Sequence, residues 1–314
     1  MGTEFQAILA GKDPEYLRDA GSQALDEVER LEAQLSHYRP DSDVTDLNVR
    51  AYHQAVRLEP LLYRLLRHAV ELSEATGGAF DCALGALIRC WGFFRGQGAL
   101  AEEAAVKEAL EQCGSRWLEL DDDARTVRFL RPVQVHLGAI GKGYAVDRMV
   151  GVLREVGVRA ALVHGGTSTL YALGAPPGDT DWSVGLCDPS DRTRRLGVVR
   201  LRDRALSTSG DYEQFFEIAG RRYSHLLDPR TGYPAVGMRS ATVAAASATD
   251  TDALSTAAFV LGPTGASEVL ERFPGTGAVL LPDVSLDSGR VVEVHGEIDF
   301  SLEDAAAGTR GEET

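Results

Sequence analysis

The segment VHLGAIGKGYAVD, residues 135–147, decides the fold because it changes the local structure twice within a short stretch. Apolar residues at 133–137 predict a strand, the glycines that follow predict a tight turn, and the apolar spacing after Lys142 predicts a helix to Val156. A helix that starts at such a turn presents backbone amides to an anion, and Lys142 adds a positive charge there. The segment is not a Walker A loop, because Gly143 stands where Ser or Thr should follow the lysine. Two interpretations stay open, an anion-binding turn and a purely structural turn.

Helices and strands are mixed on both sides of this segment without a strict β–α–β alternation. Apolar residues at helical spacing predict helices at 14–37, 60–76, 99–113, 253–261 and 265–273. Strands are predicted at 117–120 and 126–130 as a hairpin, then at 160–163, 182–186, 196–201, 214–218, 223–227 and 241–246, with two more near the C-terminal end. The pattern favours an α+β fold, with mixed sheets and flanking helices, over a doubly wound sheet. We expect one domain over residues 1–302 and a mobile tail over residues 303–314, which have few large apolar side chains.

The composition limits the ligands that the chain can bind through its overall charge. Of its 314 residues, 32 are Lys or Arg and 47 are Asp or Glu, which gives a net charge of −15. Such a chain repels nucleic acid, so we expect no nucleic-acid partner. A phosphate-bearing ligand would need a local lysine, backbone amides or a divalent cation. The four cysteines show no CxxC spacing, which argues against a zinc ribbon or a disulfide scaffold.

The apolar stretches are too short for the roughly 20 residues of a membrane span, and the N-terminal MGTEFQAILAG shows no signal peptide. We therefore expect a soluble, cytoplasmic chain without a membrane span. The alternative, an extracytoplasmic lipoprotein, requires that a leader has been trimmed from the sequence.

The segment TDTDALST, residues 249–256, suggests a metal site. Asp252 and Thr256 are four residues apart, so on a helix they share one face. A carboxylate and a hydroxyl are hard oxygen ligands of the kind that Mg²⁺ prefers. The alternative is that Thr249 or Asp250 merely caps the helix.

A histidine in a turn-rich region is the candidate base. His225 stands at the predicted end of a strand, just before the turn-forming sequence DPRTG at 228–232. An imidazole in that position can accept a proton near neutral pH. The alternative is a surface histidine in a hairpin.

Taken in order, these motifs closely resemble the FAD:protein FMN transferase family, the ApbE-like flavin transferases. The matching segments lie at residues 1–3, 38–48, 78–81 with 91–93, 137–147 with 165–166, 209–212, 224–234 and 252–257. Together they cover nearly the whole chain to about residue 262. The resemblance implies a single α+β enzyme with two lobes and a flavin cleft. It also implies an activity, which is the Mg²⁺-dependent transfer of FMN from FAD to a Thr or Ser hydroxyl of a target flavoprotein, with release of AMP.

The resemblance also implies roles for individual residues. The metal would be held by the Ala139 carbonyl, the Asp252 carboxylate and the Thr256 hydroxyl, with the Ser255 carbonyl as a further candidate. His225 would be the base that activates the acceptor hydroxyl. The residues implied in flavin binding are Tyr38, Asp81, Lys142, Asp147, Gly165, Gly166 and Ser209.

Two other functions use the same pocket and stay open at this point. One is an FAD-binding carrier protein that transfers nothing. The other is a Mg²⁺-dependent FAD pyrophosphatase, in which water replaces the acceptor hydroxyl and the products are free FMN and AMP. The sequence separates these three functions poorly.

Overall fold

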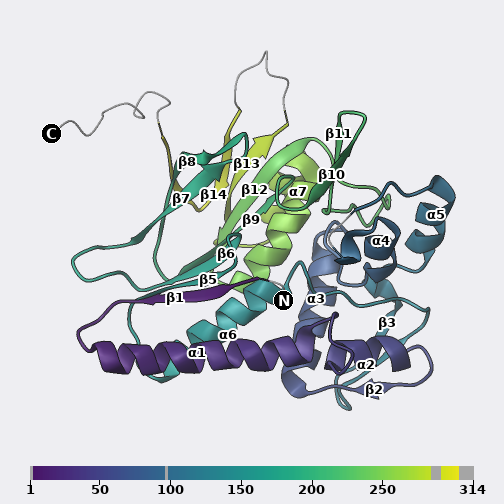
Figure 1. Ribbon diagram of the computed structural model, residues 1–314, viewed down its shortest axis with the longest axis horizontal. Coiled ribbons are helices and arrows are strands. Elements are labelled where there is room, and N and C mark those ends of the chain that lie inside the picture. Colours follow the sequence, from purple (N-terminus) through teal and green to yellow (C-terminus); the bar gives the residue numbers. More distant parts are fainter. Residues whose placement is uncertain (1–2, 96–97, 284–290, 304–314) are drawn as a thin grey trace.

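The largest element of the computed structural model, which describes residues 3–95, 98–283 and 291–303, is a seven-stranded sheet (Figure 1). Its neighbouring strands pair antiparallel. In spatial order, the strands are β1 (Phe5–Leu9), β5 (Ala161–Gly165), β6 (Thr169–Leu173), β9 (Arg204–Gly210), β12 (Met238–Ala245), β13 (Gly277–Pro282) and β14 (Glu293–Gly296). The sheet therefore joins the N-terminal segment to the second half of the chain.

Three smaller sheets accompany the large one. They are β15 (Asp299–Leu302), β8 (Asp191–Leu201) and β7 (Trp182–Asp188); β2 (Val56–Arg57), β4 (Thr126–Phe129) and β3 (Leu118–Asp121); and the hairpin of β10 (Phe215–Ile218) and β11 (Arg221–Ser224). The predicted hairpin of 117–120 and 126–130 is confirmed as β3 and β4. The predicted tail begins after β15, and its residues 304–314 lie outside the described residues.

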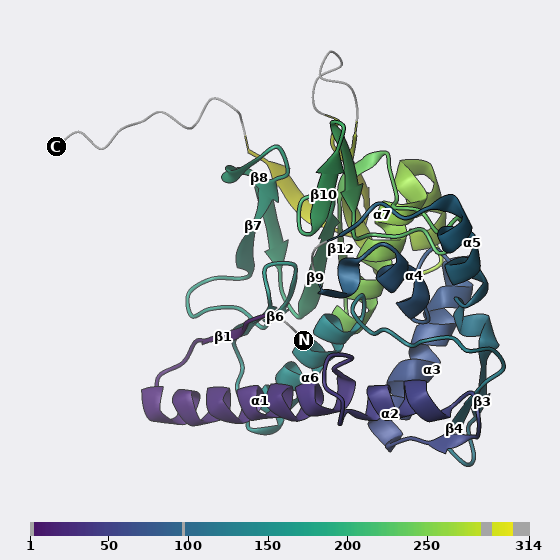
Figure 2. The ribbon, with the colours of Figure 1, turned by 45° about the vertical axis from the view of Figure 1, so that its right-hand side comes forward.

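The helices flank these sheets (Figure 2). They are α1 (Pro14–Leu35), α2 (Asp43–Arg50), α3 (Pro60–Ala75), α4 (Gly85–Cys90), α5 (Glu103–Glu111), α6 (Gly141–Glu155) and α7 (Ala248–Leu270), with 3₁₀ turns η1 (Phe93–Arg95) and η2 (Ser115–Trp117). The predicted helices at 14–37 and 60–76 are confirmed as α1 and α3, whereas the one predicted at 99–113 is shorter, as α5. In the described part of the chain, no helix combines the length and the apolar character needed to cross a membrane.

The large sheet is covered on both faces, and the side chains of β5 show how. Val163 packs with Met149 of α6 in one apolar cluster. Its neighbour Leu162 points to the opposite face and packs with Leu186 of β7 and Val199 of β8. Successive strand residues point to opposite faces, so one strand serves two cores. The sheet is thus sandwiched between α6 and α7 on one side and β7 and β8 on the other.

A second group of elements, from α2 to β4, gathers on one side of the molecule (Figures 1 and 2). Its core contains Leu62 and Leu66 of α3 and Phe80 of the following loop, all almost inaccessible to solvent. Ala253 and Ala257 of α7 belong to the same core. Helix α7 therefore packs both on the large sheet and on this second group of elements, which we call the helical lobe. This mixed, two-lobed arrangement confirms the predicted α+β fold.

The prediction of a strand at 133–137 is wrong, because the segment belongs to no strand. The side chain of Asn48 takes the place of a neighbouring strand. The Val135 backbone N–H donates to Asn48 Oδ1 at 2.7 Å, and Asn48 Nδ2 donates to the Val135 carbonyl at 2.9 Å. The neighbouring backbone groups bond outside any strand as well, since the His136 N–H donates to the Cys82 carbonyl at 2.7 Å and the Gln134 carbonyl accepts from the Gly85 N–H at 3.1 Å, so the segment needs no sheet partner.

The two predicted helices at 253–261 and 265–273 belong to α7, which starts earlier than predicted. Ser247 is the N-cap, because its side chain accepts a hydrogen bond from the Asp250 N–H, so neither Thr249 nor Asp250 caps the helix. A break at Gly262, with φ +70° and ψ 179° just before Pro263, separates the two predicted parts. Asp250 instead contacts Nε2 of His68 on α3 through Oδ1 at 2.6 Å.

Helices α6 and α7 approach each other closely at Gly143. A Cβ atom at this position would lie 2.0 Å from the Ala248 carbonyl oxygen and 2.9 Å from the Asp252 Cβ. Only a residue without a side chain fits between these backbones. The glycine that follows Lys142 therefore sets how near the start of α6 comes to α7.

Gly143→Ala should lower the free energy of unfolding by about 1–3 kcal/mol, the usual cost of overpacking a tight core. Gly151→Ala is the matched control on the same helix, where a Cβ would meet no atom within 4 Å. It should raise stability by up to about 1 kcal/mol, because alanine favours a helix over glycine. Chemical denaturation of both variants tests this, and equal stabilities would contradict the close approach of α6 and α7.

Candidate active site

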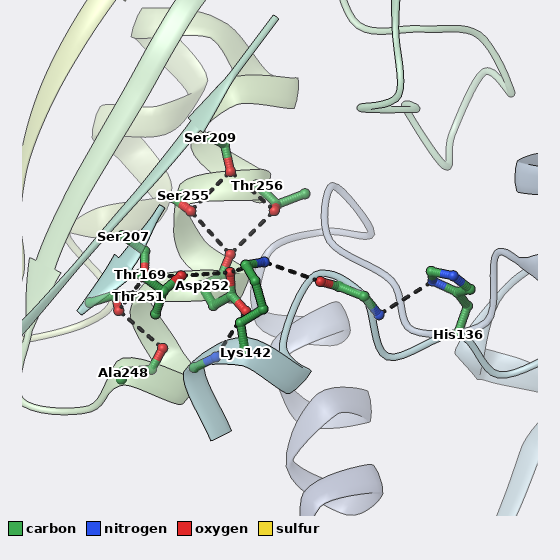
Figure 3. Close-up of polar contacts among 12 residues, drawn as sticks. His136, Lys142, Thr169, Ser207, Ser209, Ala248, Thr251, Asp252, Ser255 and Thr256 are labelled. Atoms are coloured by element: carbon green, nitrogen blue, oxygen red, sulfur yellow. Dashed lines mark hydrogen bonds and ion pairs between the residues drawn. The ribbon is translucent and has the colours of Figure 1, made fainter. Parts of the chain in front are cut away.

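The centre of the candidate site is the carboxylate of Asp252, in the second turn of α7 (Figure 3). The residue is only 4% exposed. Its Oδ1 accepts from Lys142 Nζ at 3.0 Å and from the Thr169 hydroxyl at 3.3 Å, and its Oδ2 accepts from the Gly143 N–H at 3.1 Å. A buried carboxylate is stable only with such compensation. Asp252 and Lys142, far apart in the sequence, are therefore joined at the start of α6.

Hydroxyl groups from β9 and α7 gather beside the backbone carbonyl of Asp252 (Figure 3). Ser209 Oγ lies 3.0 Å from Ser255 Oγ and 3.3 Å from Thr256 Oγ1. The Thr256 hydroxyl also donates to the Asp252 carbonyl at 3.2 Å, one helical turn back. The structure thus brings together four residues that the sequence predicts for the site: Lys142, Ser209, Asp252 and Thr256.

The Gly-rich turn faces the same place. Lys142 Nζ donates to the Gly138 carbonyl at 3.3 Å as well as to Asp252. A small cavity of about 50 Å³ beside the turn is lined by Tyr38, Gly138 and Lys142, among other residues. Tyr38 is 56% exposed, so its ring is available to a ligand. Ala139 follows Gly138, but the contacts of the described residues do not join its carbonyl to Asp252 or Thr256, and its role as a ligand stays a prediction.

Two histidines, His136 and His37, lie next to the Gly-rich turn, and one of them bonds its backbone. His136 Nδ1 accepts from the Gly138 N–H at 3.3 Å, and its Nε2 lies 3.1 Å from Nε2 of His37. Because Nδ1 is an acceptor, the ring proton of neutral His136 is on Nε2 and is donated to His37. Burial lowers the pKa of His136 to about 3 and that of His37 to about 4, so both rings are neutral at pH 7.

His225 follows β11 directly and is half-buried. Its backbone N–H donates to the Gln214 carbonyl at 3.0 Å, and its Nδ1 donates to the same oxygen at 3.1 Å. A carbonyl can only accept, so the proton is on Nδ1 and the Nε2 lone pair can take another. Burial lowers the pKa of His225 to about 4; the Gln214 carbonyl opposes this shift, and the charge of Lys142 adds to it. His225 is therefore neutral at pH 7, as a base must be.

Asp147, predicted to line the flavin site, holds the first turn of α7. Its Oδ1 accepts from the Ala248 N–H at 2.8 Å. Its Oδ2 accepts from the Ser247 hydroxyl at 2.8 Å and from the N–H and hydroxyl of Thr249 at 2.8 and 2.6 Å. An anion at a helix N-terminus satisfies free amides and favours the helix dipole. Asp147 thus fixes α7, and through it Asp252, from a position on α6.

The carboxylate of Asp81 is also buried and accepts hydrogen bonds from other groups of the protein. Its Oδ1 accepts from the Ala83 N–H at 2.7 Å, and its Oδ2 accepts from the hydroxyls of Ser73 and Ser115 at 3.0 and 2.9 Å. The Ser115 N–H also donates to it. These bonds tie the loop after α3 to η2. Direct contact of Asp81 or Asp147 with a flavin stays a prediction, and the observed bonds give both residues a structural role.

Gly165 and Gly166, predicted for the flavin site, end β5 beside the start of α6. A Cβ at Gly165 would lie 3.0 Å from Phe5 Cε1 and from Val146 Cγ2, and 3.5 Å from the Lys142 carbonyl oxygen. Gly166 has a φ of +68°, which favours glycine, and lines a cavity of about 450 Å³. That cavity lies on the β7 and β8 side of the large sheet, since Leu186, Leu196 and Leu206 also line it.

Several polar groups of the site have no role among the predictions made from the sequence. Thr169 contacts Asp252, Ser207 Oγ lies 2.9 Å from Thr251 Oγ1, and the Gln214 carbonyl orients His225. Part of the signal was present in the sequence: Ser207 and Ser209 are two apart and so share a strand face. Thr169 and Gln214 offered no such signal, because only the packing of separate strands brings them to the site.

Comparisons with known proteins place this site in a family. The family model described as ApbE family matches residues 1–281. The chain belongs to the ApbE family. It is 38% identical over 281 residues to the FAD:protein FMN transferase of Treponema pallidum (strain Nichols), covering 83% of this chain and 77% of that protein. It is 32% identical over 239 residues to the FAD:protein FMN transferase of Klebsiella pneumoniae (strain 342), covering 75% of this chain and 73% of that protein.

Solved structures agree with this membership. The crystal structure of the ApbE protein of Thermotoga maritima MSB8 superposes with a TM-score of 0.85 at 30% identity, covering 94% of each chain. The apo form of the flavinyl transferase ApbE of Pseudomonas stutzeri gives a TM-score of 0.78 at 30% identity, covering 93% of this chain and 95% of that one. The α+β architecture is therefore that of ApbE proteins.

The structural role of Asp147 can be tested without any ligand. Asp147→Ala should lower the free energy of unfolding by about 2–4 kcal/mol, because several donors at the start of α7 lose a charged acceptor. Asp26→Ala, at an exposed position on α1, controls for the loss of a charge and should change stability little. If Asp147→Ala keeps the stability of the unaltered protein and only weakens FAD binding, the carboxylate serves the flavin and not α7.

Proposed function

We propose that this chain is a Mg²⁺-dependent FAD:protein FMN transferase, which attaches FMN from FAD to a Thr or Ser hydroxyl of an acceptor flavoprotein and releases AMP. One observation carries the proposal. A buried carboxylate from α7, a lysine at the start of α6 and hydroxyls from β6, β9 and α7 meet beside a Gly-rich turn. In a chain of net charge −15, such a local site is what a diphosphate requires.

The groups at this site fit a magnesium ion by their chemistry. Asp252 offers a carboxylate oxygen, Thr256 a hydroxyl, and the turn at Gly138 and Ala139 offers carbonyls, all of which are hard oxygen donors. When bound, Mg²⁺ supplies positive charge to the diphosphate oxygens. Asp252 and Thr256 would hold it, with Ala139, and Lys142 would add a second positive charge. Tyr38 would line the flavin site from the exposed side of the small cavity.

His225 supplies the proton transfer in this proposal. The acceptor hydroxyl oxygen attacks the FMN-side phosphorus, the bond from that phosphorus to the AMP oxygen breaks, and Nε2 of His225 takes the hydroxyl proton. The Gln214 carbonyl keeps the Nδ1 proton in place, so that Nε2 presents its lone pair. The neutral state of the ring at pH 7 supports this role. Little else is covalent in such a reaction, and positioning and charge neutralisation account for most of the rate.

Incubation with Mg²⁺ and FAD, with and without an acceptor protein, separates this activity from its two rivals by the mass of the products. A transferase gives flavinylated acceptor and AMP only when the acceptor is present. A pyrophosphatase gives free FMN and AMP without it. A carrier leaves FAD intact in both mixtures, which would refute the proposed activity.

His225→Ala should lower the transfer rate about 10²–10⁴-fold, the usual contribution of a general base. Binding of FAD, measured by equilibrium titration, should change little, because the imidazole acts on the acceptor hydroxyl. His225→Gln, which keeps a polar side chain but cannot act as a base near pH 7, should be equally slow. Loss of FAD binding in both variants would make His225 a structural residue.

Asp252→Asn should raise the Mg²⁺ concentration needed for half-maximal transfer at least roughly tenfold, since an amide is a much weaker ligand than a carboxylate. Asp250→Asn is the matched control, because Asp250 lies two residues away and contacts His68 on α3. Its Mg²⁺ requirement should stay that of the unaltered protein. An unchanged requirement in Asp252→Asn would contradict the assignment of Asp252 as a metal ligand.

A further inference from the structure

The ammonium of Lys142 lies between the two sides of the magnesium site that the proposed function requires (Figure 3). Its Nζ is 3.0 Å from Asp252 Oδ1 on α7 and 3.3 Å from the Gly138 carbonyl oxygen on the turn. Both are oxygens of the kind that bind a divalent cation. The lysine thus makes the contacts that a cation would make between these two elements.

The oxygens of Asp252 differ in how they can accept an ion. Oδ2 faces the backbone of α6, where it accepts from the Gly143 N–H. The space there is closed, since even a methyl group at Gly143 would lie 2.0 Å from the Ala248 carbonyl oxygen. Oδ1 faces the turn and accepts from both Lys142 and Thr169, which occupies its two lone-pair directions. A cation that binds Asp252 must therefore displace a donor from Oδ1.

Lys142 is the donor that would leave. An ammonium and a divalent cation beside one carboxylate oxygen repel each other strongly, whereas the neutral Thr169 hydroxyl does not oppose the cation. The lysine side chain is flexible and is 24% exposed, so it can turn toward solvent and the adjoining cavity. Thr169 is fixed within β6 and buried.

We propose that Lys142 is an internal counter-ion of Asp252 that the divalent cation displaces, so that metal binding frees the Lys142 ammonium for the substrate's diphosphate. The inference rests on the magnesium site of the proposed function. It adds an order of events: without metal, the ion pair compensates the buried carboxylate, and with metal, the carboxylate binds the cation and the lysine turns to the diphosphate. Lys142 thereby couples metal binding to FAD binding.

The lysine content of the chain gives a direct test. The chain has three lysines, Lys12, Lys107 and Lys142, and the first two are exposed. Amine acylation of the full chain without FAD, followed by mass spectrometry, reports the reactivity of each lysine with and without Mg²⁺. The acylation rate of Lys142 should rise at least roughly tenfold with Mg²⁺, because the loss of one charge-assisted hydrogen bond has an effect of that size or larger. Lys12 and Lys107 are internal references and should not change.

Asp252→Asn separates this inference from the metal site itself, when Mg²⁺ binding is measured by calorimetry on the same samples. In this variant, Lys142 should react fast with or without Mg²⁺, because its partner has lost its charge. One outcome contradicts the displacement but keeps the metal site: Mg²⁺ binds the unaltered protein and not Asp252→Asn, yet the reactivity of Lys142 in the unaltered protein stays constant or falls when Mg²⁺ is added. If Mg²⁺ does not bind, or binds equally to Asp252→Asn, the metal site fails, and the displacement fails with it.

Discussion

The structure of the site depends on one buried carboxylate at the contact between α6 and α7. Asp252 is almost fully buried, and a buried charge is costly unless other groups compensate it. The compensation comes from the first residues of α6, through the Lys142 ammonium and the Gly143 amide. The absence of a side chain at Gly143 makes this approach sterically allowed. An electrostatic requirement and a packing requirement therefore meet in two consecutive residues of the Gly-rich turn.

The acidic residues around this contact have divided roles. Asp147 on α6 holds the first turn of α7, and Asp252 on α7 is held by the first turn of α6. Each helix thus provides a carboxylate that accepts hydrogen bonds from the first turn of the other helix or from the cap before it. Asp250, between them in sequence, contacts His68 of α3 and so ties α7 to the helical lobe. The position of the site carboxylate is fixed by the large sheet, by α6 and by this lobe together.

Much of the fold could be predicted from the sequence because its signals are local. The apolar spacing and Pro14 predicted α1, and the alternation around 121–123 predicted the hairpin of β3 and β4. The strand predicted at 133–137 failed for a non-local reason, since the side chain of Asn48, distant in the sequence, bonds both backbone groups of Val135. The start of α7 was misplaced for a partly similar reason: the Ser247 cap is local, but Asp147, which holds the same turn, comes from α6.

The site was predicted in part. Helical spacing put Asp252 and Thr256 on one face, and the structure brings Lys142 and Ser209, which the resemblance assigned to flavin binding, to the same place. For Asp81 and Asp147 it was the resemblance to the family that suggested flavin contacts, whereas their hydrogen bonds stabilise the protein itself. Neither the Gln214 carbonyl nor the Thr169 hydroxyl could be identified in advance, because neither belongs to a motif.

In the proposed function, Asp252, fixed where α6 meets α7, holds a divalent cation against the diphosphate of FAD. The most direct test is anomalous diffraction from crystals grown with Mn²⁺, a substitute for Mg²⁺, and FAD. We expect a strong peak about 2.0–2.3 Å from Asp252 Oδ1, within reach of the Thr256 hydroxyl and of an oxygen of the diphosphate. A peak bound elsewhere on the protein, with Lys142 still paired to Asp252 beside a bound FAD, would contradict it.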